Sequence, residues 1–583
     1  MVSGSENFEA AADFWRTPAN VQRRYVTLPS GVLHYRIALP DETARFAPAP
    51  QRVPLLCIHL TPNSGRVYAR FIAAMGLDRI AIAADTPGFG LSPLRAGPIS
   101  IDGHAAALGE LLDHLAVTHD LTRVDVMGYH TGSKIALALA RARPQQVRRL
   151  VLVSAPVYTP TELAAQRASL GADGETPRRD GAHLQARWQG HWAFKDPDAD
   201  AWFVQREVAE GLRAAAHAHH TYRAAFDVQH AEELPRVAQP ILLLCPNDDL
   251  AVPTRRAAAL LRTGRFVELP NWAHGFLDFH TDDAAALVRE FLDDSATEET
   301  APVASSAHAD TSMRTAAPTH VEHEVRAQYH AGPYGLLHYR RACDSTTAVP
   351  LYLLHMSPNS SRIFDALLVE MGRDREVIAL DTPGFGESDA PPAPPSIEDY
   401  AACVAHLADA LGHTQIDVLG YHTGAMTAIA LAVARPKLLR RVVQISCPVF
   451  TADERAAFRA EYRGRELRAD GSHLVESWLN LQRFYGPAVP LEVLARNFAE
   501  GLRGGPFAPW GHRAAFDYDL AAALPKVTQP VLIVNPADDL ALQTPRGLAL
   551  LRDARLFELP AHAHGFIDSI THDFAGALRE FLG

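Results

Sequence analysis

Short apolar runs alternate along the chain with longer stretches in which alanine and leucine recur at helical spacing. Five runs in the first half are rich in Val, Ile and Leu and end in turn residues: VPLLCIHL, IAIAAD, VDVMGY, LVLVSAP and PILLLCP. Such runs are typical of parallel strands buried on both faces of a sheet. Because helical stretches such as SKIALALARARP separate them, we predict an α/β fold, a mostly parallel sheet with helices on both faces. YVTLPSGVLHYR alternates around Ser30-Gly31 and predicts an antiparallel hairpin ahead of these strands.

The same series of motifs occurs twice in the same order. LHYR, DTPGFG, GYHTG, DDLA and AHGF each appear in both halves of the chain, and HLTPNSGR returns as HMSPNSSR. From HLTPNSGR onward the offset falls only from 296 residues, between His59 and His355, to 290 residues, between Ala273 and Ala563. A nearly constant offset indicates a duplicated domain. We therefore predict two tandem α/β domains, residues 20–293 and 328–583.

Two further kinds of segment differ in composition from the strands and helices of the predicted core. Residues 294–327 are rich in Ala, Ser, Thr and Pro and lack an apolar period, which predicts a flexible linker. Residues 157–234 and 449–524 have a helical pattern, include several tryptophans and differ most between the copies. Because each lies between two strands of the predicted core, we expect a helical lid over the carboxyl ends of each sheet.

The segment VDVMGYHTGSK predicts a strand, a sharp turn between two glycines and a helix. Together with the ordered motifs that follow it, this turn resembles the nucleophile elbow of the α/β-hydrolase superfamily. The resemblance extends over nearly all of both copies and implies the fold of that family. The family carries Ser, Cys or Asp at the centre of the elbow, whereas this chain has His130 and His422.

The resemblance also implies an acid after a later strand and a histidine near the end of each copy. The spacing to Pro253 favours Asp249 over Asp248 as the acid of the first copy. The family pattern falls on four residues: Asp249, His274, Asp539 and His564. Asp85 and Asp381 of DTPGFG are expected to shape a loop.

HLTPNSGR and its counterpart resemble the oxyanion loop of the same family. That loop implies a pair of backbone N–H donors in each copy for a developing negative oxygen. The donors are Leu60 and Thr131 in the first copy, and Met356 and Thr423 in the second. His59 and His355 are expected to support the loop.

A carboxylate and two imidazoles permit several kinds of chemistry. The elbow histidine could attack a carbonyl carbon, or activate water or remove a substrate proton as a base. These routes predict hydrolysis of a small ester, lactone or thioester, or a lyase reaction at the same oxyanion hole. Two imidazoles and a carboxylate also form a known metal-ligand set, but the family holds no metal there, so no metal or cofactor is expected. Loss of the serine before duplication would instead leave a small-ligand-binding or scaffold protein.

Composition narrows the partners. The formal net charge of −12 disfavours a nucleic acid or an anionic membrane surface as partner. The five cysteines lack CxxC spacing, which favours free thiols, and MVSGSENFEAAADFW has no basic start followed by an apolar core. No run of about 18 apolar residues occurs, so no membrane span is expected. We expect a cytoplasmic protein with a small-molecule substrate and an intramolecular pair of domains.

Overall fold

The computed structural model describes residues 4–40, 52–170, 176–295, 325–343, 347–462, 464, 466–487 and 489–583. The chain forms two compact units. The first unit consists of Thr17–Thr176 and Ala186–Ala316, and the second of Met1–Arg16, Pro177–Gln185 and Ala317–Gly583. Each unit contains one series of motifs. The predicted linker, residues 294–327, lies almost wholly outside the described residues.

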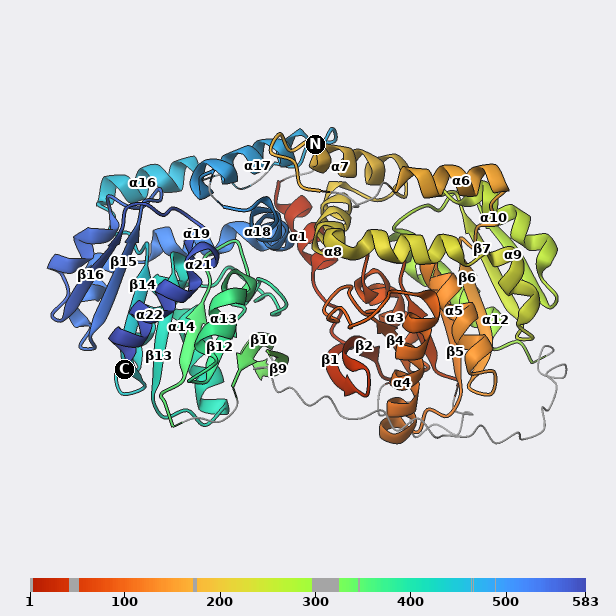
Figure 1. The fold of residues 1–583 in the computed structure, drawn as a ribbon, viewed down its shortest axis with the longest axis horizontal. Coiled ribbons are helices and arrows are strands. Elements are labelled where there is room, and N and C mark those ends of the chain that lie inside the picture. The colour runs from red at the N-terminus through yellow and green to blue at the C-terminus, as the bar shows by residue number, and fades with distance from the viewer. Residues whose placement is uncertain are drawn as a thin grey trace. The chain divides into compact units, whose positions relative to one another are not determined.

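The first unit is built on one eight-stranded sheet with the order β1-β2-β4-β3-β5-β6-β7-β8 (Figure 1). The first two strands form the predicted antiparallel hairpin, β2 pairs antiparallel with β4, and all later neighbours run parallel. The strands are β1 Val21–Leu28, β2 Gly31–Ala38, β3 Leu55–Ile58, β4 Ala81–Ala84, β5 Val124–Tyr129, β6 Val147–Val153, β7 Ile241–Pro246 and β8 Gly264–Leu269. The prediction of a mostly parallel sheet is confirmed.

Helices cover both faces of this sheet, as predicted. On one face α4 (Ile101–His119) and α5 (Thr131–Ala142) pack on the strands in one apolar core. On the other face α3 (Ala69–Met75), α11 (Phe276–Phe279) and α12 (Thr281–Leu292) enclose a second core. Strands β3, β4, β5 and β7 are buried along their whole length, because side chains on both faces meet helices.

The second unit repeats this arrangement. Its sheet has the order β9-β10-β12-β11-β13-β14-β15-β16, and helices enclose two cores. Its strands are β9 Arg326–Gly332, β10 Gly335–Ala342, β11 Leu351–Leu354, β12 Val377–Leu380, β13 Ile416–Tyr421, β14 Leu439–Ile445, β15 Val531–Pro536 and β16 Ala554–Leu559. The covering helices are α13 Asp365–Met371, α14 Ile397–Ala410, α15 Thr423–Ala434, α21 Phe566–Ser569 and α22 Thr571–Leu582. α1 (Gly4–Trp15) also belongs to this unit, where the indole N–H of Trp15 donates to the Arg503 carbonyl over 2.9 Å.

Helices occupy both segments that were predicted as lids. Residues 157–234 contain α6 Pro160–Ser169, α7 Ala182–Phe194, α8 Ala201–Asp227 and α9 His230–Glu233. Residues 449–524 contain α16 Ala452–Glu461, α17 Ser472–Tyr485, α18 Leu491–Arg503, α19 Ala508–Asp517 and α20 Leu520–Ala523. The long helix α8 corresponds to the pair α18 and α19, which Gly504, Gly505 and Pro506 separate, because these residues disfavour a continuous helix. In the first unit α8 runs across one end of the sheet (Figure 1).

The turn between β5 and α5 holds its central residue in an unusual backbone conformation. His130 has φ 49° and ψ −114°, and His422 has φ 51° and ψ −113°. A Cβ on Gly128 would lie 2.3 Å from the Gly132 carbonyl oxygen, and one on Gly132 would lie 2.1 Å from the Ile58 carbonyl oxygen. Only glycine fits at either position, so the two glycines allow the strand, the turn and the helix to pack this closely.

Replacing Gly424 by alanine should destabilise the second unit. The new Cβ would lie 2.1 Å from the backbone oxygen of Leu354, and a clash with backbone is relieved only by moving β11 or α15. We expect a loss of about 1–3 kcal/mol or more in the free energy of unfolding. Urea unfolding of the full chain measures it. The control is Gly576→Ala in α22, where a Cβ meets nothing within 4 Å and stability should be kept or raised. Equal stability of the two variants would contradict this account.

Candidate active site

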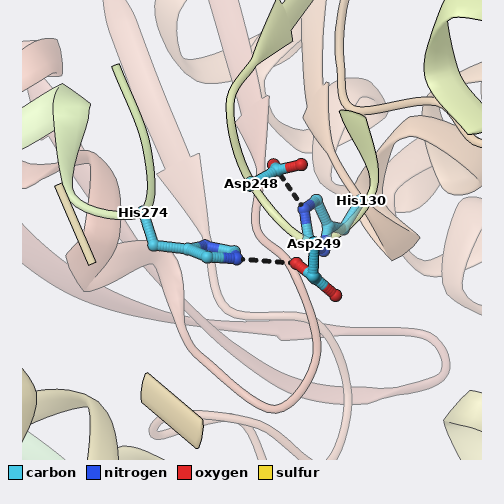
Figure 2. A group of neighbouring side chains, drawn as sticks. All are labelled: His130, Asp248, Asp249 and His274. Carbon is cyan, nitrogen blue, oxygen red and sulfur yellow. Dashed lines mark hydrogen bonds and ion pairs between the residues drawn. The ribbon is translucent and has the colours of Figure 1, made fainter. Parts of the chain in front are cut away.

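Two histidines and two aspartates meet at the centre of the first unit, and each histidine faces its own carboxylate (Figure 2). His130 Nε2 lies 3.0 Å from Asp248 Oδ2, and His274 Nε2 lies 2.9 Å from Asp249 Oδ1. The two imidazole rings are edge-on, with centres 5.1 Å apart. Because both ε nitrogens face carboxylates, the site consists of two His–Asp pairs side by side.

The second unit repeats the constellation with slightly different spacing. His564 Nε2 lies 2.8 Å from Asp539 Oδ1. His422 Nε2 lies 3.5 Å from Asp538 Oδ2, a distance within the range of an ion pair but long for a hydrogen bond. The ring centres of His422 and His564 are 5.0 Å apart. Both units therefore bring the sequence-predicted acid and both predicted histidines together.

The positions of these side chains follow from the sheet. His130 comes directly after β5, the two aspartates follow β7, and His274 lies in the turn between β8 and α11. All three strands run parallel, so their carboxyl ends meet at one edge. Ligands of open α/β sheets bind at this edge.

The sequence favours Asp249 over Asp248, and in the structure Asp248 and its counterpart Asp538 each face the elbow histidine of their own unit. Asp248 is buried: its Oδ2 accepts from the Ser154 hydroxyl over 2.5 Å, and its Oδ1 accepts from the Leu250 N–H over 2.9 Å. The only signal for Asp248 in the sequence was the pair of aspartates in DDLA. The spacing to Pro253 could select one aspartate as the acid, but it could not indicate where the side chain of the other points.

Electrostatics keep both carboxylates of the first site ionised. Burial by itself would raise the pKa of Asp249, but the hydrogen bond with His274 and the nearby charge of His130 lower the pKa far below its usual range. Burial would likewise raise the pKa of Asp248, but the hydrogen bond with His130 and the nearby charge lower it below its usual value. An ionised Asp248 accepts the hydrogen bond, so His130 carries its proton on Nε2 and has its lone pair on Nδ1 when neutral.

The second nitrogen of the C-terminal histidine contacts a tyrosine. The hydroxyl of Tyr129, the residue before the elbow histidine, lies 3.2 Å from His274 Nδ1, and the Tyr421 hydroxyl lies 2.9 Å from His564 Nδ1. Burial lowers the pKa of His274, but the hydrogen bond with Asp249 and the charge of Asp248 raise it more, so its pKa lies above the ordinary value. The tyrosines were not singled out from sequence, although they occupy the second position of GYHTG.

The predicted oxyanion loop follows β3, and His59 is tied into it. Its Nδ1 donates to the Leu60 carbonyl over 2.8 Å, and its Nε2 accepts from the Thr86 N–H over 3.0 Å. Burial lowers the pKa of His59, which keeps the ring neutral. His355 makes the same two contacts, with Met356 and Thr382. Thr131 and Thr423 open the helices after the elbows, where backbone N–H groups have no acceptor within the helix.

Asp85 fastens the loop after β4 to the oxyanion loop. Its buried carboxylate accepts from Arg36 over 2.9 Å, from the Gly65 N–H over 2.7 Å and from the Leu91 N–H over 3.0 Å, and lies 2.8 Å from His34 Nδ1. Burial opposes ionisation, but Arg36 and His34 lower the pKa of Asp85 far below its usual range. These contacts give Asp85 the structural part expected for the DTPGFG motif.

A cavity of about 590 Å³ opens onto the first site beneath the lid. Besides His130, Asp249 and His274, its lining includes Leu60 and the lid residues Arg187, His191, Glu207 and Tyr222. At the offset of 290 residues, Ser477, Leu481 and Asn497 of the second lid correspond to Arg187, His191 and Glu207. The first pocket is therefore lined by more ionisable side chains than the same positions of the second copy provide.

Comparison with known proteins finds a matching family model in each unit. Residues 349–477 match the family model described as alpha/beta hydrolase fold, and residues 52–277 match the one described as serine aminopeptidase. The 2-(acetamidomethylene)succinate hydrolase of Mesorhizobium japonicum is 28% identical over 195 residues, which cover 32% of this chain and 70% of that protein. The pimeloyl-(acyl-carrier protein) methyl ester esterase of Neisseria meningitidis serogroup C is 30% identical over 247 residues, covering 40% of this chain and 93% of that protein.

Among solved structures, a hydrolase from Pseudomonas aeruginosa is 25% identical, covers 44% of this chain and 98% of its own, and has a TM-score of 0.36. With the extent of the esterase match and the two sheets described above, the chain belongs to the α/β-hydrolase superfamily. The relatives named here are hydrolases. Among the described residues, no helix is both long and apolar enough to cross a membrane.

Replacing Asp85 by asparagine should destabilise the first unit strongly at neutral pH. The variant leaves the buried Arg36 without its carboxylate, and breaking a buried pair costs about 3–5 kcal/mol. Because the folded-state pKa of Asp85 lies below its unfolded value of about 3.9, the contribution is complete above that pH and declines as the pH falls below it. Urea unfolding at several pH values should show the deficit shrinking below about pH 4. The exposed variant Asp102→Asn is the control and should behave like wild type throughout.

Proposed function

We propose that each copy hydrolyses a small carbonyl compound, an ester, lactone or thioester, at its His–Asp–His site beneath the helical lid. The first copy uses His130, Asp249 and His274, and the second uses the counterparts of these residues: His422, Asp539 and His564. One observation carries the proposal. The residues that the family places at the elbow, after a later strand and near the C-terminus come together in both units, with a histidine at the elbow.

The elbow imidazole is the group that reacts. It accepts a proton from water while the water oxygen bonds to the carbonyl carbon, or it attacks that carbon itself and is released by water in a second step. In both routes the bond to the departing alcohol or thiol breaks, and the leaving atom takes up a proton. The lone pair on Nδ1 supports either role for His130, because Nε2 is engaged with Asp248.

The negative oxygen of the intermediate is held by backbone N–H groups of Leu60 and Thr131, or of Met356 and Thr423. The contacts of His59 with Leu60 and Thr86 support this assignment, since they fix the loop that carries one of the donors. Asp249 orients His274 beside the elbow imidazole. The relatives named as an esterase and as a hydrolase support this class of reaction.

Replacing the elbow histidines by alanine tests the proposal. His130→Ala should abolish turnover in the first copy and His422→Ala in the second, because an essential base or nucleophile contributes a factor of about 10² or more to the rate. A screen of aryl esters, lactones and thioesters with wild type, both single variants and the double variant measures the effect. The exposed variant His572→Ala is the control and should retain wild-type rates. Turnover that survives the double variant refutes the proposal.

Replacing the same histidines by serine separates a site built around histidine from one that has only lost its serine. Serine restores the ordinary elbow of the family, so a degenerate esterase should gain activity on simple aryl esters. A site that works through histidine should instead lose its reaction, because the shorter side chain does not reach the reacting carbon. We expect loss. Gain of ester hydrolysis by His130→Ser, from an inactive wild type, would favour a catalytically degenerate binding protein.

A further inference from the structure

Each site contains one carboxylate more than the catalytic triad of the family. In the first unit, donor atoms of His130, Asp248, Asp249 and His274 all lie within 4.8 Å of one another (Figure 2). Both imidazoles present Nε2 to carboxylate oxygens, at 3.0 Å and 2.9 Å. An ordinary triad needs a single acid behind its histidine. The second carboxylate calls for a role of its own.

The second unit contains the same four residue types in the same arrangement. Donor atoms of His422, Asp538, Asp539 and His564 also lie within 4.8 Å of one another. His564 Nε2 is 2.8 Å from Asp539 Oδ1 and 4.0 Å from Asp538 Oδ2, so it faces both carboxylates. The constellation is thus kept in both copies, although their lids differ in sequence.

This spacing suits one metal ion. Imidazole nitrogens and carboxylate oxygens bind zinc at about 2.0–2.2 Å, which places neighbouring donors roughly 3–4 Å apart. Two imidazoles with carboxylates suit first-row transition ions such as zinc, manganese and iron, whereas calcium and magnesium prefer oxygen donors alone. Four protein donors leave two positions free on a six-coordinate ion, enough for a water and a substrate oxygen.

The groups around the four donors also have the form of a metal site. Metal-bound histidines usually donate their other ring N–H to a fixed partner. The Tyr129 hydroxyl lies 3.2 Å from His274 Nδ1, and the Tyr421 hydroxyl lies 2.9 Å from His564 Nδ1. Ser154 and the Leu250 N–H hold Asp248, and Ser446 and the Leu540 N–H hold Asp538. When an ion displaces the proton from Nε2 of the C-terminal histidine, Nδ1 carries the remaining proton and donates it to the tyrosine oxygen.

The negative charges of the two aspartates also favour a bound cation. Asp248 and Asp249 are adjacent in sequence and present carboxylates to one small space, and the side chain of Asp248 is fully buried. The Asp249 side chain is 42% exposed, so it is the buried Asp248 that most needs compensating positive charge. One divalent cation between the four donors compensates both carboxylates.

We propose that each copy binds one divalent first-row transition ion through its two histidines and both aspartates. The expectation of no metal rested on the resemblance to a family that holds no metal at this position, whereas the structure gathers two histidines and two aspartates there. The inference rests on the proposed function for its consequence: a metal-bound water ionises more readily and supplies the attacking oxygen. Its proton goes to the leaving group as the acyl–oxygen or acyl–sulfur bond breaks.

The test measures metal without reference to turnover. Full-length protein is stripped with a chelator, titrated with Zn²⁺ or Mn²⁺, dialysed and analysed for bound metal. We expect two ions per chain, bound more tightly than about 10 µM, and no comparable binding of Mg²⁺ or Ca²⁺. His130→Ala or His422→Ala should each leave one ion, and the double variant none. Asp248→Asn should weaken binding in the first copy at least about tenfold.

His280→Ala is the matched control. In the first copy His280 also pairs with a carboxylate, Asp196, over 3.1 Å, but that carboxylate already accepts from the backbone N–H groups of Asp198 and Ala273. This variant should keep both ions. Circular dichroism verifies folding. If the double histidine variant does not fold, the pair Asp248→Asn and Asp538→Asn gives the same readout.

Three outcomes overturn the inference: no saturable binding of either ion, unchanged stoichiometry in the double variant, or loss of an ion in His280→Ala alone. Turnover assays on the stripped protein separate this result from the proposed function. If the stripped protein binds no ion and still hydrolyses esters at the wild-type rate, the metal site is refuted and the proposed hydrolase function stands. If the protein binds two ions but turns over no substrate, the metal site stands and the proposed hydrolase function is refuted.

Discussion

The site depends on one steric constraint, the close approach of the elbow glycines to the end of the neighbouring strand. A Cβ on Gly132 would lie 2.1 Å from the Ile58 carbonyl oxygen, and one on Gly424 would lie equally close to the Leu354 oxygen. This contact allows the helix to begin directly after the elbow and forces the residue between the glycines to a φ near +50°. A non-glycine residue adopts this conformation at an energetic cost, which the packing of strand and helix offsets. The histidine side chain is thereby raised toward the carboxyl edge of the sheet.

Much of the fold could be predicted because its determinants are local. Runs such as VDVMGY are apolar throughout, since both faces of each central strand meet helices, and the spacing of the motifs was enough to recognise the duplication. Gly504, Gly505 and Pro506 also indicate the break between α18 and α19, although our sequence analysis did not predict it. Residues 294–327 could not be compared with their prediction, because they lie almost wholly outside the described residues.

The candidate site was harder to predict because it depends on side-chain directions. Family spacing selected Asp249, which does face His274, but it could not indicate that Asp248 turns the other way toward His130. The two aspartates lie in the turn after β7, which ends at Pro246, and this turn directs their side chains to two different partners. The tautomer of His59 could not be predicted from the sequence either, because it depends on the N–H of Thr86, which follows another strand of the sheet.

The pairing of each imidazole with its own carboxylate changes what the site can do. In a linear acid–histidine–nucleophile chain, one histidine nitrogen contacts the acid and the other faces the reacting group. Here both nitrogens of His274 are engaged, Nε2 by Asp249 and Nδ1 by the Tyr129 hydroxyl. His274 therefore has no nitrogen left to relay a proton from His130 without breaking one of these contacts. In the proposed hydrolysis the elbow histidine acts through Nδ1, and in the proposed metal site both imidazoles are ligands of one ion. The four donors, held in the same way in two units with different lids, are arranged for the second alternative as well as for the first.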